Sequence, residues 1–160
     1  MQVHYKPREI GLIKKLVLLT DRPVFIVGQC PGRQRKNDTV DYVFHGNRTG
    51  DFIEEIIDEI DSPQRIFLTN VTNYQIDIKT ERHLKFYIEK GLAELIGHAE
   101  HFKPRRIIAL GDFAYNKIID LTSLSYFIPV RKLQHPSFIL RFNKSRDMYK
   151  TNLKQLIYKP

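Results

Sequence analysis

An apolar run that ends in a glycine-bracketed polar turn decides the fold: Val24-Phe25-Ile26-Val27-Gly28-Gln29-Cys30-Pro31-Gly32. Its first four residues are β-branched or aromatic and do not alternate with polar ones, which is typical of a strand buried on both faces of a parallel sheet. Gly28 and Gly32 allow the chain to turn sharply where the strand ends. Open α/β sheets bind ligands at the carboxyl ends of their strands, so we expect the active site at this turn. Many α/β proteins also end a strand in such a turn without any chemistry there.

Strand and helix patterns alternate along the rest of the chain. Further strands are predicted at 65–71, 106–110 and 126–130, and helices at 9–20, 51–60, 80–101, 113–119 and 145–158. In the helix at 51–60 the apolar residues recur at helical spacing, and the Ser62-Pro63 pair ends it. This alternation predicts an α/β fold, a three-layer α/β/α sandwich around a short, mainly parallel four-stranded sheet. Residues 1–160 are long enough for a single domain with its own core.

Composition points to a folded protein inside the cell. Hydrophobic residues make up 42% of the chain, and no apolar run approaches the roughly 20 residues of a membrane span. The N-terminus lacks the basic-then-apolar pattern of a signal peptide, so we expect an intracellular protein, cytoplasmic or nucleoid-associated, with no membrane partner. Cys30 is the single cysteine, which excludes an internal disulfide and any all-cysteine zinc or iron–sulfur site within one chain.

The net charge of +8 is concentrated at one end of the sequence. Residues 131–160 contain eight Lys and Arg side chains against the single acid Asp147. A basic surface of this kind favours a polyanion such as nucleic acid as partner. Solvated charge on a last helix is the alternative interpretation.

Three polar segments follow one another at or after the predicted strand ends: Gly28-Gln29-Cys30-Pro31-Gly32, Thr69-Asn70-Val71 and His135-Pro136-Ser137. Taken in order, they resemble the uracil-DNA glycosylase superfamily. Its members share a Gly-x-x-Pro-Gly or Gly-Gln-Asp-Pro-Tyr first motif, an Asn-bearing middle strand and a late His-Pro-Ser loop. Between them, Phe44-His45-Gly46 with Thr49-Gly50 is similar to the family's Phe-x-Gly-x-x-x-Gly segment. The nearest branch by pattern is the thermophile type, which holds an iron–sulfur cluster on four cysteines; with Cys30 alone this chain cannot, so we expect no metal and no cofactor.

The resemblance implies a DNA glycosylase, which must flip its base out of the stack and hold it in the protein. Gly28 would lie against the base, and Phe44 would stack on it. Asn70 would read the base edge, because an amide offers a donor and an acceptor side by side. His135 would donate a hydrogen bond to the base oxygen where the leaving charge collects. A core phenylalanine, a turn-forming asparagine and a surface histidine are the alternatives to these roles.

DNA is the partner that the resemblance implies, bound by a protein expected to act as a monomer. Ser137 and Arg141 fit phosphate contacts, and Lys144 and Arg146 extend the basic track. Such contacts set affinity and its salt dependence rather than base choice. Phe138 or Leu140 could wedge into the gap that the flipped base leaves, or cap the core.

The first motif departs from the family pattern. Where many members carry Asp, Asn or Glu, this chain has Gln29 and Cys30, so a carboxylate general base is missing from its usual place. Gln29 could orient a water, Asp38 or Asp41 could supply charge, and Cys30 could act as a nucleophile only with a lowered pKa. The leading interpretation is a glycosylase that hydrolyses the N-glycosidic bond of uracil or a related damaged or modified base. A degenerate member that binds DNA or a base without excision, a nucleotide-processing α/β enzyme and a Rossmann-like protein with coincidental turns are the alternatives.

Overall fold

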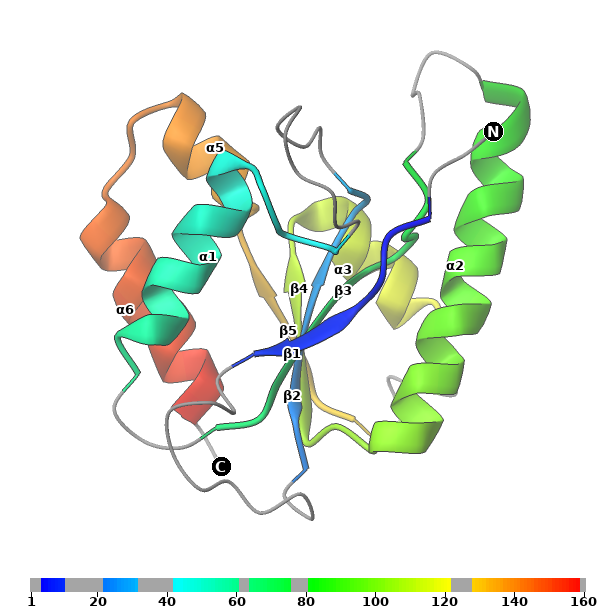
Figure 1. Ribbon diagram of the computed structural model, residues 1–160, viewed down its shortest axis with the longest axis horizontal. Helices are drawn as coiled ribbons and strands as arrows, with labels where there is room; N and C mark the ends of the chain where they lie inside the picture. Colours follow the sequence, from blue (N-terminus) through cyan, green and yellow to red (C-terminus); the bar gives the residue numbers. More distant parts are fainter. Residues whose placement is uncertain are drawn as a thin grey trace.

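The computed structural model describes residues 4–10, 22–31, 42–60, 64–75, 81–121 and 128–158. Within these ranges strands and helices follow each other along the chain (Figure 1). The strands are β1 (Arg8–Ile10), β2 (Val24–Gly28), β3 (Ile66–Asn70), β4 (Arg106–Leu110) and β5 (Val130–Leu133). The helices are α1 (Arg48–Asp58), α2 (Glu81–Phe102), α3 (Asp112–Ile119), α5 (Pro136–Arg141) and α6 (Arg146–Tyr158).

The five strands form one sheet in the order β1-β3-β2-β4-β5. Strands β2, β3, β4 and β5 are parallel, and β1 runs antiparallel to β3 at one edge. The register pairs Gly28 with Asn70 across β2 and β3, and Leu110 with Leu133 across β4 and β5. The carboxyl ends of the four parallel strands therefore meet along one edge of the sheet.

Alternate residues of the central strands feed two separate cores. Ile26, Leu68 and Ile108 belong to a cluster with α1, α5 and α6, whereas Phe25, Phe67 and Ile107 belong to a cluster with α2 and α3. Figure 1 shows these two groups of helices on opposite sides of the sheet. Because both faces are covered, β2, β3 and β4 are buried at every position, as the apolar runs in their sequences predict.

The predicted three-layer α/β/α arrangement is confirmed, with five strands rather than four. The last strand was expected at 126–130 but spans Val130–Leu133, and residues 122–127 lie outside the described ranges. The prediction failed because β5 is an edge strand: Arg131 and Lys132 are exposed, so its sequence lacks the apolar run of the inner strands.

The helix expected at 9–20 is wrong at its start, where Glu9 and Ile10 belong to β1. Pairing of β1 with β3 overrides the helical spacing of the apolar residues, and an ion pair of 2.8 Å between Glu9 and Arg65 ties the two segments. Residues 11–21 lie outside the described ranges. None of the helices in the described part of the chain combines the length and apolar character that a membrane span requires.

Helix α2 packs its backbone directly on the segment that follows β3. A Cβ atom at the buried Gly91 would lie 2.3 Å from the Val71 carbonyl oxygen and 2.5 Å from the Thr72 Cα atom. On the same helix, the exposed Gly97 has no atom within 4 Å of the corresponding position. The two glycines thus differ in surroundings while sharing one helix.

We predict opposite effects of Gly91→Ala and Gly97→Ala on the free energy of unfolding. Gly91→Ala should lower it by about 1–3 kcal/mol, because the methyl group has no room and backbone must shift. Gly97→Ala should raise it by about 0.5–1 kcal/mol through the better helix propensity of alanine. Urea denaturation followed by circular dichroism measures both. Equal responses would contradict the close packing of α2 on the end of β3.

Candidate active site

The ends of β2 and β3 approach each other where the first motif begins. A Cβ atom at Gly28 would lie 2.5 Å from Asn70 Oδ1 and 2.7 Å from Phe44 Cζ. Both distances are too short for any side chain, so only glycine fits there. The structure thus brings together the three residues predicted to bind the base, Gly28, Phe44 and Asn70.

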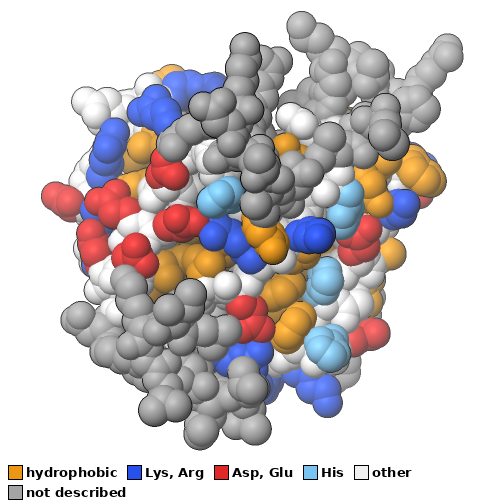
Figure 2. All heavy atoms as spheres, viewed as in Figure 1, with side chains coloured by type: hydrophobic (Ala, Val, Ile, Leu, Met, Phe, Trp, Pro, Cys, Tyr) orange, Lys and Arg blue, Asp and Glu red, His pale blue; other side chains and the backbone are white. Residues whose placement is uncertain are grey.

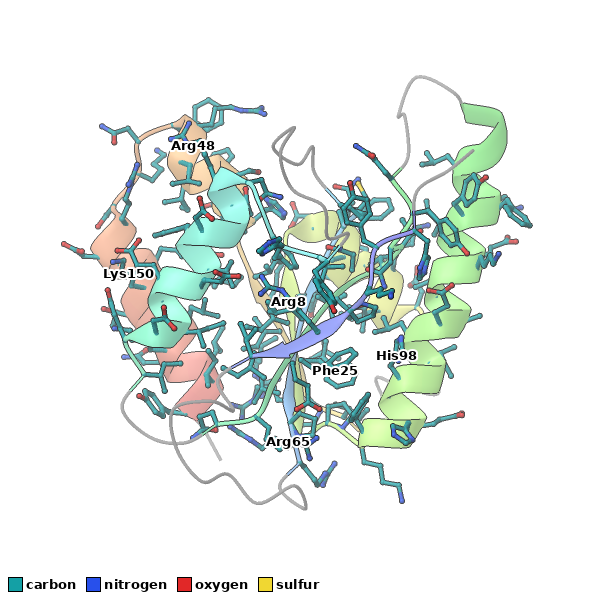
Figure 3. All side chains as sticks on the ribbon, in the orientation of Figure 1. Arg8, Phe25, Arg48, Arg65, His98 and Lys150 are labelled. Carbon is teal, nitrogen blue, oxygen red and sulfur yellow. The ribbon has the colours of Figure 1, made fainter. Side chains whose placement is uncertain are left out.

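The Phe44 ring is held in place by a loop with an unusual backbone. Phe44 has a φ of 52°, a left-handed conformation that non-glycine residues rarely adopt. Arg8 stabilises it, donating from Nε to the Val43 carbonyl (2.9 Å) and from Nη2 to the Phe44 carbonyl (2.6 Å), and it forms an ion pair with Glu54. A Cβ at Gly50 would lie 2.1 Å from the Phe44 carbonyl oxygen, so the loop also packs tightly on α1. Figure 3 shows Arg8 on β1, in the centre of the molecule.

Asn70 is buried, with 2% of its surface exposed, and its amide is only partly bonded. Its Nδ2 lies 3.4 Å from Asn73 Oδ1, which also accepts from the Asn70 backbone N–H at 3.2 Å. Asn70 Oδ1, the atom that faces Gly28, has no hydrogen-bond partner within the described residues. A buried acceptor without a partner is costly, and it marks a position where a ligand donor would be stabilised.

His135 lies two residues beyond β5, on the same edge of the sheet. Its Cβ is 3.4 Å from the position of a Cβ at Gly111, the residue after β4. In the sheet β4 lies between β2, which carries Gly28, and β5, which His135 follows, and with strands about 4.8 Å apart the two residues are roughly 10 Å from each other. The structure therefore places His135 across the edge from Asn70, without a direct contact between them.

The His135 ring is oriented by the start of α5, of which His135 is the N-cap residue. Its Nδ1 accepts from the Ser137 backbone N–H at 3.2 Å and lies 2.7 Å from the Ser137 hydroxyl oxygen. Burial lowers the pKa of His135 from its usual value of 6.5, so the ring is neutral at neutral pH. Because Nδ1 accepts, the ring hydrogen lies on Nε2, which leaves an N–H donor for a ligand.

Gln29 and Cys30 form the turn itself and are both half-buried. The turn is attached to the segment after Asn70, since the Gly28 and Gln29 carbonyls accept from the N–H groups of Val71 (2.8 Å) and Thr72 (3.2 Å). Burial raises the pKa of the Cys30 thiol above its usual range, so it is protonated at neutral pH and is a poor base or nucleophile. Gly32, Asp38 and Asp41 lie outside the described ranges.

Ion pairs with acidic side chains neutralise part of the positive charge of the last thirty residues. Lys150 pairs with Glu55 and Glu59, Lys154 pairs with Glu59, and Lys132 pairs with Asp112. Arg141, Lys144 and Arg146, around the turn between α5 and α6, are exposed, and within the described ranges no acid pairs with them. Figure 2 shows Lys and Arg side chains along the upper left of this face, and Asp and Glu side chains below them.

One further cation lies close to this turn. Arg48 is the first residue of α1, is exposed, and appears beside α5 in Figure 3. A cation at a helix N-terminus opposes the helix dipole, so helix stability does not explain it. Among the described residues, no group of three or more His, Cys, Asp or Glu side chains is placed to hold a metal ion.

A model of the uracil DNA glycosylase superfamily matches residues 18–157. The chain belongs to this superfamily. The match includes the first motif, the Asn70 strand and the His135 loop, and it confirms the resemblance found in the sequence. A search among curated proteins found no match.

The fold is also similar to that of a solved structure. The crystal structure of wild-type SMUG2 from Pedobacter heparinus is similar, with a TM-score of 0.56 and 13% sequence identity. The similarity covers 96% of this chain and 89% of that chain. At such low identity the likeness concerns the fold alone.

Sequence reasoning did not identify two residues that contact Phe44 and Asn70 in the structure. Arg8 fixes the Phe44 loop from 36 residues away, and no local pattern indicates that contact. Asn73 bonds to Asn70, and here a signal existed, because asparagine side chains often bond to backbone a few residues away.

Protonation of His135 should destabilise the folded protein. The pKa is lower in the folded than in the unfolded chain, so below about pH 6.5 the unfolded chain binds a proton that the folded one does not. The contribution of His135 to the free energy of unfolding is fully present above about pH 6.5. It falls with decreasing pH by at most about 1.4 kcal/mol per pH unit, until the pKa of His135 in the folded protein is reached. His135→Asn keeps an N-cap acceptor without titrating.

As the pH falls from 7.5 to 5.5, we therefore expect the free energy of unfolding of the wild type to decrease more than that of His135→Asn. Urea titrations of both proteins at several pH values measure this difference, from which other titrating groups cancel. A difference that stays constant with pH would contradict a buried, neutral His135.

Proposed function

We propose that this protein is a DNA glycosylase that hydrolyses the N-glycosidic bond of uracil, or of a related damaged or modified base, flipped out of DNA. The observation that carries the proposal is Asn70 Oδ1, which is buried beside Gly28 and Phe44 and has no hydrogen-bond partner among the described residues. Flipped bases are read by hydrogen bonds to their pairing edge and by stacking on aromatic rings. An amide oxygen next to a phenylalanine ring supplies both.

Breaking the glycosidic bond leaves positive charge on the sugar and negative charge on the base. His135 supports this step, because a neutral ring with its hydrogen on Nε2 can donate to the base oxygen without losing a proton. Gln29 is the residue proposed to orient the attacking water. Cys30 is protonated and neither Gln29 nor Cys30 is a carboxylate, so these two residues would supply no strong general base, and rate enhancement would come from base binding and leaving-group stabilisation.

The proposed DNA surface runs over the start of α5 and its turn into α6. Arg141, Lys144 and Arg146 would contact phosphates, and Arg48 would extend the same side. Ser137 has a second task, since its N–H and hydroxyl bond to His135. Action on DNA implies that the protein works inside the cell, in the cytoplasm or on the nucleoid, and we propose that it does so as a monomer.

Excision is tested with single- and double-stranded oligonucleotides that carry uracil, hypoxanthine or a 5-substituted pyrimidine, with alkali-labile abasic sites as the readout. Gly28→Ala should lower the rate at least about a hundredfold, because its methyl group would displace Asn70 Oδ1 and the Phe44 ring. His135→Asn should lower the rate by about 10²–10³-fold through loss of the donor. Gly97→Ala is the control and should excise as the wild type does.

Two outcomes would count against this proposal. If Gly28→Ala excises at the wild-type rate, the base does not bind at the ends of β2 and β3. If the wild type makes no abasic site on any substrate, excision is the wrong function.

A binding protein without excision is the second candidate, favoured by the missing carboxylate at Gln29 and Cys30. Gln29→Glu and Cys30→Asp separate the two candidates, because each restores a carboxylate to the first motif. If the protein is a glycosylase, both variants should change an existing rate. If activity arises only in a variant while the wild type binds DNA without product, the natural protein is a binder.

A further inference from the structure

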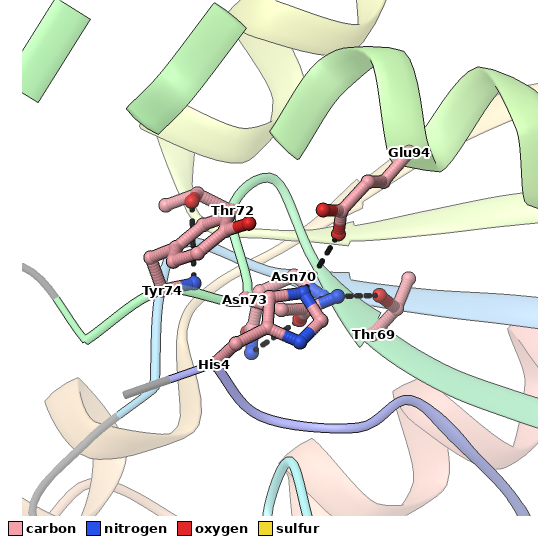
Figure 4. A network of polar contacts seen from close by, with 7 residues as sticks. All are labelled: His4, Thr69, Asn70, Thr72, Asn73, Tyr74 and Glu94. Atoms are coloured by element: carbon pink, nitrogen blue, oxygen red, sulfur yellow. Dashed lines mark hydrogen bonds and ion pairs between the residues drawn. The ribbon is translucent and has the colours of Figure 1, made fainter. Parts of the chain in front are cut away.

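We infer that Asn73 is a positioning residue that fixes the direction of the Asn70 amide and so makes the site select uracil against cytosine. The inference rests on the proposed function, since it assigns base choice to the same site. Figure 4 shows the contacts, which run from Thr69 through Asn73 to Asn70.

The chain of contacts begins at a group whose polarity is fixed. The Asn70 backbone N–H can only donate, so the Asn73 atom 3.2 Å from it must be the oxygen, Oδ1. Asn73 Nδ2 then points the other way, where it donates to Thr69 Oγ1 at 2.9 Å. Both ends of the Asn73 amide are therefore assigned by their partners.

The direction of the Asn70 amide follows from that of Asn73. The atom of Asn70 that faces Asn73 Oδ1, at 3.4 Å, must be a donor, and so it is Nδ2. The oxygen is then directed at Gly28, where it has no partner within the described residues. A reversed amide would place two oxygens against each other in a buried site, at high cost.

No strand of the sheet bonds to the Asn70 backbone N–H, so among the described residues it is available to a side chain. The last pair of β1 with β3 on the carboxyl side is Arg8 with Leu68, so Asn70 lies beyond the end of β1. On its other side β3 pairs with β2, and the next residue, Val71, donates to the Gly28 carbonyl. Asn73 is buried, with 2% of its surface exposed, and supplies the acceptor that a longer β1 would have given.

The pairing edges of the two pyrimidines differ at N3. Uracil carries N3–H, a donor that can bond to Asn70 Oδ1, whereas N3 of cytosine is an acceptor and would face another acceptor. Sites built around one hydrogen bond reject the base that lacks it, because their own buried group is then unpaired. The amide direction set by Asn73 therefore decides which base the site accepts.

The test measures binding to two single-stranded oligonucleotides that carry one 2′-fluoro-2′-deoxyuridine or one 2′-fluoro-2′-deoxycytidine, whose glycosidic bonds resist cleavage. The ratio of their dissociation constants should favour the uracil analogue at least about tenfold in the wild type. In Asn73→Leu the ratio should fall toward one, because either direction of the Asn70 amide becomes available. In Asn73→Asp, which keeps an acceptor for both Asn70 groups, it should stay within about threefold of the wild type.

Asn73→Ala provides a second route to the same result. It also removes the whole Asn73 amide, and with a smaller side chain than leucine, so the ratio should again fall toward one. This variant carries the test if thermal melting shows that Asn73→Leu does not fold. A merely structural role of Asn73 would weaken both oligonucleotides alike and leave the ratio unchanged.

The binding measurements distinguish failure of the inference about Asn73 from failure of the proposed glycosylase function. If the wild type prefers the uracil analogue and the ratio is unchanged in folded Asn73→Leu or Asn73→Ala, the role of Asn73 is overturned and the base site stands. If the wild type binds both oligonucleotides equally, Asn70 Oδ1 does not read N3–H and the inference fails. If it binds neither, the proposed function and the inference fail together.

Discussion

The pairing of Gly28 with Asn70 at the ends of two central strands determines where the rest of the site can lie. Because β2 and β3 are parallel and in register, the amide of Asn70 stands directly beside the start of the turn. The missing side chain of Gly28 lets that amide and the Phe44 ring come within a few ångströms of one backbone position. A one-residue change in register would exchange the faces of the strand and separate them.

Each core of the molecule contributes one part to this edge. From the side of α1, α5 and α6 come the Phe44 loop, supported by Arg8, and the His135 ring, oriented by the first turn of α5. From the side of α2 come the backbone of Val71 and Thr72, which Gly91 contacts closely, and the bonds that hold the first motif to them. Close packing in both layers thus holds Asn70 Oδ1 in a buried position where no described residue bonds to it.

The sequence alone predicted the parts of the molecule that depend on local pattern. Buried strands β2, β3 and β4 each contain an apolar run of three or four residues, and the ordered motifs indicated the family and the residues Gly28, Phe44 and Asn70, which the structure brings together. Edge strands were less predictable: β1 is short, and β5 carries exposed Arg131 and Lys132. Their identity depends on neighbouring strands rather than on their own residues.

Contacts between distant segments were beyond the reach of sequence reasoning. Lys150 reads as free positive charge in the sequence, yet it pairs with Glu55 and Glu59 on α1, so the basic surface is smaller than composition indicates. The absent carboxylate at Gln29 and Cys30 was visible at once, but the protonated state of the thiol follows from burial, which only the fold provides.

The support that Arg8 gives to Phe44 makes the integrity of the site depend on the sheet edge. Strand β1 has three residues and a single neighbour, so it is the part of the sheet with the fewest bonds to break. Partial opening of a protein takes place at such elements at a lower free energy than global unfolding. Fraying of β1 would release the Val43 and Phe44 carbonyls and relax the left-handed backbone at Phe44, while the two cores behind it remain folded.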